Sequence, residues 1–109
     1  MSDPTPGPFH GLRVIDCSTE IAGPYATRLL VEAGADVVKV EAPGGDPLRR
    51  WTASGATAPE GDTAPLFQFL NASKRSIVLD VETASGKRDL LDLASSADLL
   101  VESYTPEQA

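Results

Sequence analysis

The sequence predicts an α/β fold, a Rossmann-like and mostly parallel open sheet of about four strands with helices between them. Two observations carry this prediction. Short apolar, β-branched runs recur along the chain, and turn residues bound each one, as expected of strands buried in a parallel sheet. Between these runs, apolar residues repeat at spacings of three and four, the period of a helix with one buried face. Alternation of the two patterns is typical of parallel α/β sheets.

The first strand–helix–strand unit is the most clearly marked. A strand is expected at Leu12–Asp16, and a cluster of turn residues follows it. Pro24 suits the first position of a helix, where its missing N–H needs no partner, and Gly34 suits the residue just past the helix end. Residues 36–41 are β-branched and mostly apolar, which indicates a second buried strand. The unit must cross over in the right-handed sense.

The rest of the chain repeats this alternation after a long loop. Residues 42–64 are small, polar and rich in Gly and Pro, so we expect no regular structure there. The further elements expected are a short helix from Pro65 to about Asn71, a third buried strand at 76–80, a helix capped by Thr83 and a fourth strand at 99–101.

The two ends of the chain are expected to differ in structure. Residues 1–8 carry Pro, Gly, Ser and Asp without an apolar signal segment, and we expect a disordered lead-in before a segment at 9–109. No helix is expected after the fourth strand, so the fold resembles an incomplete part of a larger domain. An uncovered apolar sheet face is an interaction surface, so self-association is expected.

Composition narrows the classes of partner. The formal net charge of −7 argues against nucleic acid, because binding to phosphate backbones rests on a basic surface. With Cys17 as the single cysteine and His10 as the single histidine, neither a disulfide framework nor a metal cluster is expected. We expect a buried, inert thiol and a reducing, cytoplasmic location. No apolar run approaches the roughly 18 residues of a membrane span, so no membrane partner is expected.

The loop Ser18–Gly23 is the first candidate site. It follows a strand and precedes a helix, at the sheet edge where parallel α/β proteins bind ligands and where free N–H groups favour an anion. It could equally serve only to turn the chain. Glu41 ends the second strand where an acid would bind ribose in a dinucleotide site. The G-x-G-x-x-G pattern is absent, however, and this disfavours a nicotinamide or flavin cofactor.

Basic pairs stand at positions 49–50, 74–75 and 87–88 of this acidic chain. Lys87 and Arg88 lie within an expected helix near Asp92, which favours a surface ion pair. Lys74 and Arg75 lie between a helix and a strand. They could bind phosphate or cap the preceding helix, and the residues alone leave both roles open.

Six collinear segments together resemble the N-terminal part of the family III CoA-transferases. That family includes formyl-CoA and carnitine CoA-transferases and α-methylacyl-CoA racemase. The resemblance covers residues 9–106. The segments are G-L-R-V-I-D at 11–16, A-G-P-Y-A-T at 22–27, G-A-D-V-V-K-V-E at 34–41, P-G-G-D-P-L-R at 43–49, L-N-x-x-K-R-S-I-V-L-D at 70–80 and A-D-L-L-V-E at 97–102.

The resemblance implies a function and an assembly. It implies that acyl-CoA and a carboxylic acid are the substrates, without a metal, and that the protein is a homo-oligomer, since family members form interlocked dimers. In the transferases an aspartate attacks the acyl-CoA, giving a mixed anhydride and then an aspartyl-CoA thioester, which is covalent carboxylate catalysis. That aspartate lies beyond the region compared, so the 109-residue chain alone is expected to be inactive.

The resemblance also implies a set of coenzyme A contacts. By position, Thr19, Glu20, Ile21 and Ala22 lie along the CoA chain and its acyl end, Ala42 lies by the nucleotide, and Leu79 with Glu82 lies near the adenine.

Three of these positions depart from the family pattern. Ala42 stands where the family often has Arg, and Glu82 stands where it can have Lys. Phosphate charge would then come from Arg49, Lys74 or Arg75. Ile21 stands where formyl-CoA transferase has a glutamine, and an apolar side chain cannot hydrogen-bond a small dicarboxylate, which predicts another acyl group. An acyl-CoA racemase of the same family and a non-catalytic Rossmann-like module for binding or self-association stay open as alternatives.

Overall fold

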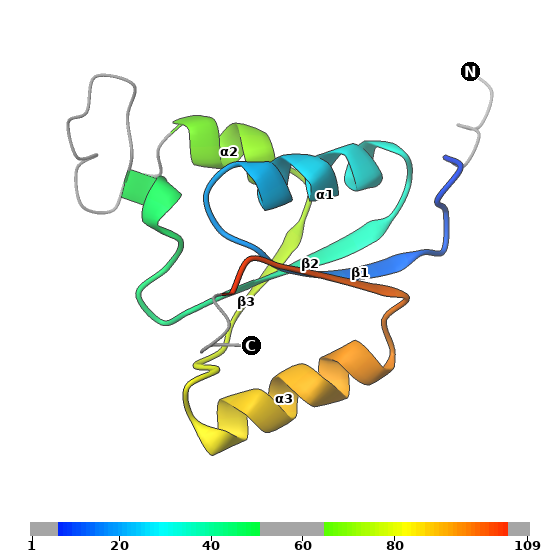
Figure 1. Ribbon diagram of the computed structural model, residues 1–109. Coiled ribbons are helices and arrows are strands. Elements are labelled where there is room, and N and C mark those ends of the chain that lie inside the picture. The colour runs from blue at the N-terminus through cyan, green and yellow to red at the C-terminus, as the bar shows by residue number, and fades with distance from the viewer. Residues whose placement is uncertain (1–6, 51–64, 105–109) are drawn as a thin grey trace.

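The computed structural model describes residues 7–50 and 65–104, and it confirms the predicted fold class. Four parallel strands form one sheet in the order β3-β2-β1-β4. Helices α1 and α2 cover one face, and α3 lies against the other (Figure 1). The elements are β1 (Arg13–Cys17), α1 (Ala22–Glu32), β2 (Asp36–Glu41), α2 (Pro65–Asn71), β3 (Arg75–Val78), α3 (Ala84–Ser95) and β4 (Leu99–Glu102).

The order of the strands reverses at β1. The chain proceeds from β1 to β2 and then β3 in one direction, and it returns to place β4 on the other side of β1. In the register, Val14 lies between Val37 of β2 and Leu99 of β4. Helix α3 crosses on the opposite face from α1 and α2, so the crossovers on the two sides of β1 lie on opposite faces of the sheet (Figure 1). Such reversal points are the usual binding crevices of open α/β sheets.

The core is divided between the two faces of the central strands. Val14 and Val37 face α1, whereas the next residues, Ile15 and Val38, face α3, because successive side chains of a strand point to opposite sides. All four are at most 9% exposed. The continuous apolar runs predicted two-sided burial, and β1 and β2 have it.

The first helix begins earlier than predicted. It starts at Ala22, so Pro24 is its third residue and not its first. The missing proline N–H is harmless there too, because the first four N–H groups of a helix have no partner within it. Gly34 does follow the helix end, with φ at +105°, a conformation that glycine adopts without strain.

Residues 47–50 correct the prediction of a loop without regular structure. They form a short 3₁₀ helix, η1 (Pro47–Arg50). The carboxylate of Asp46 accepts a hydrogen bond from the Leu48 N–H at 2.9 Å, which stabilises the start of this turn. Leu48 then packs on Phe67 of α2. Residues 51–64, including Trp51, lie outside the described residues, as do residues 1–6 of the predicted lead-in.

The third strand also differs from its prediction. It runs from Arg75 to Val78 instead of 76–80, and it is an edge strand whose Val78 is 63% exposed. An apolar run does not reveal whether its strand lies at the centre or at the edge of a sheet. Helix α2 agrees with its prediction, and Thr83 caps α3 as predicted, with its side-chain oxygen accepting the Gly86 N–H at 3.0 Å.

Candidate functional site

A cavity of about 520 Å³ lies at the carboxyl edge of the sheet, on the side of α3. Each of the four strands contributes a residue from the segment that follows it: Thr19, Ala42, Leu79 and Ser103. The rest of its lining is Cys17, Val40, Pro43, Asp80, Val81, Glu82, Lys87 and Tyr104. Of the residues predicted to contact CoA, this lining includes Thr19, Ala42, Leu79 and Glu82.

The loops after β1 and β4 are joined across the reversal point. The Thr19 N–H donates to the Ser103 hydroxyl oxygen at 3.1 Å, and the two hydroxyl groups lie 3.5 Å apart. The two loops therefore form one wall of the cavity.

The other predicted loop residues lie beside the cavity and not in its lining. Glu20, Ile21 and Ala22 are exposed, and Ile21 is 52% exposed. Glu20 adopts a left-handed conformation with φ at +69°, which a residue other than glycine adopts only at a cost of about 1 kcal/mol or more. Its N–H lies 3.4 Å from a carboxylate oxygen of Asp46, a long contact that helps to hold this conformation.

A buried polar network supports this loop from below, and its centre is Asp16. The Asp16 carboxylate, which is fully buried, accepts hydrogen bonds from the Ser18 hydroxyl and from the Ser18 N–H at 3.0 Å. It also accepts the Thr27 hydroxyl at 2.7 Å and the Lys74 ammonium at 3.0 Å. Burial favours a higher pKa for Asp16. The hydrogen bonds and the nearby lysine charges outweigh burial and hold that pKa below its ordinary value.

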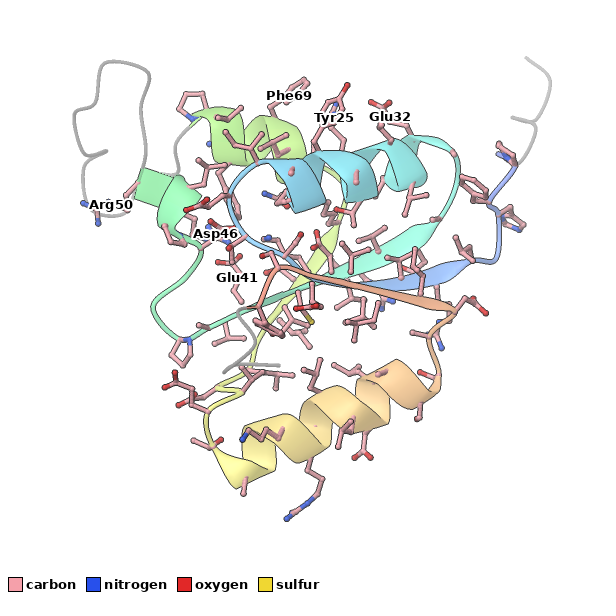
Figure 2. All side chains as sticks on the ribbon, viewed as in Figure 1. Tyr25, Glu32, Glu41, Asp46, Arg50 and Phe69 are labelled. Carbon is pink, nitrogen blue, oxygen red and sulfur yellow. The ribbon has the colours of Figure 1, made fainter. Side chains whose placement is uncertain are left out.

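The network continues through Lys39 to Asp46. The Lys39 ammonium donates to the backbone oxygen of Ser18 at 2.9 Å and lies 3.3 Å from Asp46 Oδ2. The Asp46 N–H in turn donates to Glu41 at 2.9 Å, and Figure 2 shows these two acidic residues near each other, below α2. The Arg49 guanidinium binds Glu41 through two contacts of 2.7 Å. Burial again favours a higher pKa for Glu41, but the Arg49 contacts hold that pKa below its ordinary value.

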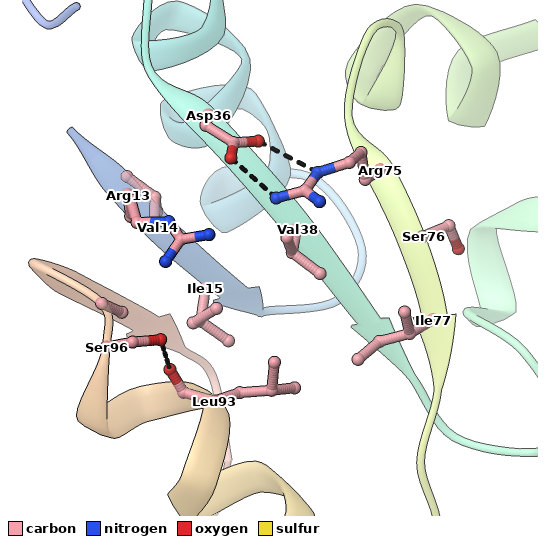
Figure 3. A pocket seen from close by; sticks show the side chains of 11 residues that line it. Arg13, Val14, Ile15, Asp36, Val38, Arg75, Ser76, Ile77, Leu93 and Ser96 are labelled. Carbon is pink, nitrogen blue, oxygen red and sulfur yellow. Dashed lines mark hydrogen bonds and ion pairs between the residues drawn. The ribbon is translucent and has the colours of Figure 1, made fainter. Parts of the chain in front are cut away.

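The basic residues expected to supply phosphate charge do not face the cavity. Lys74 is buried, and its ammonium donates to Asp16, to the Pro24 backbone oxygen at 3.0 Å and to Asn71 at 2.7 Å. Arg75 is the first residue of β3, so it lies at the opposite edge of the sheet. There it forms a two-point ion pair with Asp36, shown in Figure 3. Arg49, Lys74 and Arg75 instead line a separate cavity of about 200 Å³. Phosphate contacts of Lys74 and Arg75 stay a prediction.

Lys87, in contrast, lines the cavity, although we expected it to form a surface ion pair. Within residues 7–50 and 65–104, neither it nor Arg88 forms an ion pair with Asp92. The sequence contains a signal for this position, because Lys87 follows the Thr83 cap by four residues and the start of such a helix lies at the carboxyl edge of the preceding strand.

Cys17 and Tyr104 form part of the inner wall. Cys17 is 2% exposed, and burial raises the pKa of its thiol, as it also raises the pKa of the Tyr104 hydroxyl. The expected burial of this cysteine is confirmed. Both groups are neutral at physiological pH.

A second cavity, of about 310 Å³, lies at the amino edge of the sheet. Figure 3 shows its floor of Ile15, Val38 and Ile77, with Arg13 and Arg75 at its rim. This edge lies away from the loops that follow the strands.

The described residues hold no cluster of three or more His, Cys, Asp or Glu arranged to bind a metal. None of the described helices is long and apolar enough to cross a membrane.

Comparison with known proteins now places this geometry in a family. Residues 9–109 match the model of CoA-transferase family III. The chain belongs to this family. An acyl-CoA transferase of Fusarium pseudograminearum is 39% identical over 92% of this chain and 23% of its own length. A succinyl-CoA:mesaconate CoA-transferase of Haloarcula hispanica is 42% identical over 90% of this chain and 25% of its own. The chain thus spans about a quarter of the length of these relatives.

Solved structures agree with this assignment. A CAIB/BAIF family protein from Brucella suis has a TM-score of 0.81 with this chain and is 36% identical, over 92% of this chain and 26% of the other. The resemblance to the N-terminal part of the family III CoA-transferases is therefore confirmed. The cavity at the carboxyl edge of the sheet therefore lies in the N-terminal part of the family domain.

Proposed function

We propose that this chain is the CoA-binding portion of an enzyme that moves CoA between carboxylic acids. The single observation that carries the proposal is the cavity at the reversal point of the sheet, since all four strands contribute to it. It has an apolar floor with polar groups at its edge, the usual character of a cofactor site. Family membership supports CoA thioesters as the ligand class.

In this proposal CoA lies along the carboxyl edge of the sheet. Its adenine packs near Leu79 and Glu82, its nucleotide passes Ala42, and its chain and acyl end run past Thr19 toward the exposed residues 20–22. The support is that Leu79, Ala42 and Thr19 follow adjacent strands, so they form a continuous path from β3 across β2 to β1. Lys74 and Arg75 are left out of this site because other side chains already bind their charges.

Binding can be tested by calorimetric titration of the chain with CoA. Ala42→Trp places a large ring at the cavity wall and is expected to weaken CoA binding at least about tenfold. Ala72→Trp is the control, because Ala72 is exposed just past α2 and away from the cavity. Saturable binding that only the first variant weakens supports the proposal. No binding of CoA at millimolar concentration favours the non-catalytic module.

The chemistry proposed for the whole enzyme is transfer through a carboxylate nucleophile, which forms an aspartyl-CoA thioester. We propose that the 109-residue chain alone does not turn over, and that an acyl-CoA and a free carboxylic acid are the two substrates. The chain spans only about a quarter of its relatives, which supports this proposal. Acyl transfer by this chain above a heat-inactivated control contradicts it.

An acyl-CoA racemase is the second candidate activity. The relatives favour transfer, since both the Fusarium and the Haloarcula proteins are named as transferases. The two reactions differ in their need for a second acid. For an enzyme that contains this chain, inversion at the α-carbon without an acceptor acid supports racemisation, and exchange of CoA between two acids supports transfer.

Homo-oligomer formation is part of the proposal and rests on an exposed apolar stripe. Ile21, the N-cap of α1, is followed at intervals of four residues by Tyr25 and Leu29 of the helix, and each is about half exposed. Phe69 of α2 is 52% exposed, and Figure 2 shows it with Tyr25 on the outer side of the two helices. Exposed apolar patches can mark surfaces where protein chains meet. Light scattering should detect a dimer or larger species that Tyr25→Asp dissociates.

A cytoplasmic location stays a prediction from composition.

A further inference from the structure

The cavity contains one cation among acidic residues. Of its lining residues, Asp80 and Glu82 carry carboxyl groups and Lys87 carries an ammonium group. We propose that Lys87 binds a phosphate of CoA and thereby orients the nucleotide half of the ligand. This inference rests on the proposed function, and it assigns the phosphate contact to a residue that the sequence predicted to form a surface ion pair.

The carboxyl groups at the cavity favour a cation beside any bound phosphate. A phosphate entering near Leu79 and Glu82 meets like charge from the two carboxyl groups, which disfavours it by Coulomb repulsion. The Asp80 carboxylate is partly compensated, because it accepts the Glu82 N–H at 3.1 Å. Glu82 itself is exposed at the mouth. An ammonium group at the same wall offsets this repulsion and binds the phosphate as a point charge.

Three other cations near the carboxyl edge are already bound. Lys39 and Lys74 are buried in the network with Asp46 and Asp16. Arg49 is paired with Glu41. Lys87 is exposed, and it forms no ion pair within the described residues. Its ammonium can therefore reach a ligand without breaking an interaction of the fold.

The backbone that carries Lys87 is held against the wall of the cavity. Its N–H donates to the Thr83 backbone oxygen at 3.0 Å, in the first turn of α3. Gly86 is buried next to it, and a Cβ on that residue would lie 1.8 Å from the backbone oxygen of Asp80. This close approach fixes the start of α3 against the segment that follows β3. The backbone of Lys87 is therefore held at a fixed position relative to Leu79 and Glu82, the residues expected near the adenine.

The test is calorimetric titration of the chain with CoA, dephospho-CoA and pantetheine. Lys87→Ala is expected to weaken CoA binding about tenfold, as befits a charged hydrogen bond at a partly exposed site, and to leave pantetheine binding unchanged. Lys87→Arg should retain most of the affinity. Arg88→Ala is the matched control, since it removes the same charge from the adjacent residue, which does not line the cavity.

The titrations distinguish which phosphate Lys87 binds, and they distinguish failure of this inference from failure of the proposed function. Loss with CoA but not with dephospho-CoA assigns the contact to the 3′-phosphate, whereas equal loss with both assigns it to the diphosphate, and either result supports the proposal. If Lys87→Ala and Arg88→Ala weaken CoA binding equally, or if neither does while the parent chain binds, the inference is overturned and CoA binding stands. If the parent chain binds no CoA, the proposed function fails instead.

Discussion

The ammonium group of Lys74 lies 3.0 Å from the carboxylate of Asp16, and both side chains are at most 1% exposed. The pair joins the segment before β3 to the last part of β1, and a third contact, to the Pro24 backbone oxygen, joins it to α1. Because the Asp16 carboxylate also binds Ser18, the charge pair supports the loop that carries Thr19 and Glu20. The loop of the candidate site is therefore anchored by groups that do not themselves contact the cavity.

Removal of Lys74 should destabilise the fold strongly. Lys74→Met leaves a buried Asp16 without its ammonium partner, and such losses cost about 3–5 kcal/mol. The comparison variant is Arg75→Met, which breaks the exposed ion pair with Asp36 and should cost no more than about 1 kcal/mol. Urea unfolding followed by circular dichroism measures both. Equal losses in the two variants contradict the role given to the buried pair.

Stability should fall in acid because of Asp16 and Glu41. Their pKa values in the folded chain lie below the ordinary values of 3.8 and 4.5. The unfolded chain therefore binds more protons wherever the pH lies between the folded and ordinary values. The stabilisation is present in full above about pH 5 and is lost as the pH falls through the lower, folded pKa values. Urea midpoints from pH 7 to pH 3 measure this, and a midpoint that rises toward pH 3 contradicts it.

Glycine 23 should not accept a side chain. A Cβ there would lie 2.2 Å from the Cβ of Ser18, which is fully buried, so Gly23→Ala must displace the loop. We expect a loss of about 1–3 kcal/mol in the free energy of unfolding, together with weaker CoA binding. Gly44→Ala is the control, because a Cβ at Gly44 meets nothing within 4 Å. Urea unfolding and CoA titration of the two variants decide the matter. A Gly23→Ala variant as stable as the control shows that the loop adapts freely.

Neutralising Glu82 should strengthen CoA binding. Glu82→Gln removes a carboxylate from the wall of the cavity and keeps the size of the side chain, so repulsion of the ligand phosphates falls. We expect the affinity for CoA to rise about twofold to fivefold, with a smaller gain at high salt. The control is Glu32→Gln, which removes the same charge from α1, away from this cavity, and should change the affinity for CoA little. Calorimetry in low and high salt measures both, and weaker binding by Glu82→Gln assigns the carboxylate a direct ligand contact.

The order and kind of the elements follow from local patterns in the sequence. Four predicted features agree with the structure because each depends on neighbouring residues alone. They are the strands at 36–41 and 99–101, the helix that begins at Pro65 and the cap at Thr83. The position of the candidate site at the ends of the strands follows from the same patterns, since parallel strands end at one edge of the sheet. The family, too, was recognisable from collinear segments.

Tertiary structure alone decided which polar groups are buried and which line the cavity. Lys39 lies in a strand and Lys74 in a loop, yet both ammonium groups are buried, because Asp46 and Asp16 come from distant segments to meet them. Lys87 looks like a surface residue in its helix, yet it lines the cavity. A charge is buried, paired or free according to contacts between residues far apart in the chain. Sequence by itself therefore determined the elements and their family, and packing decided the roles of the charges.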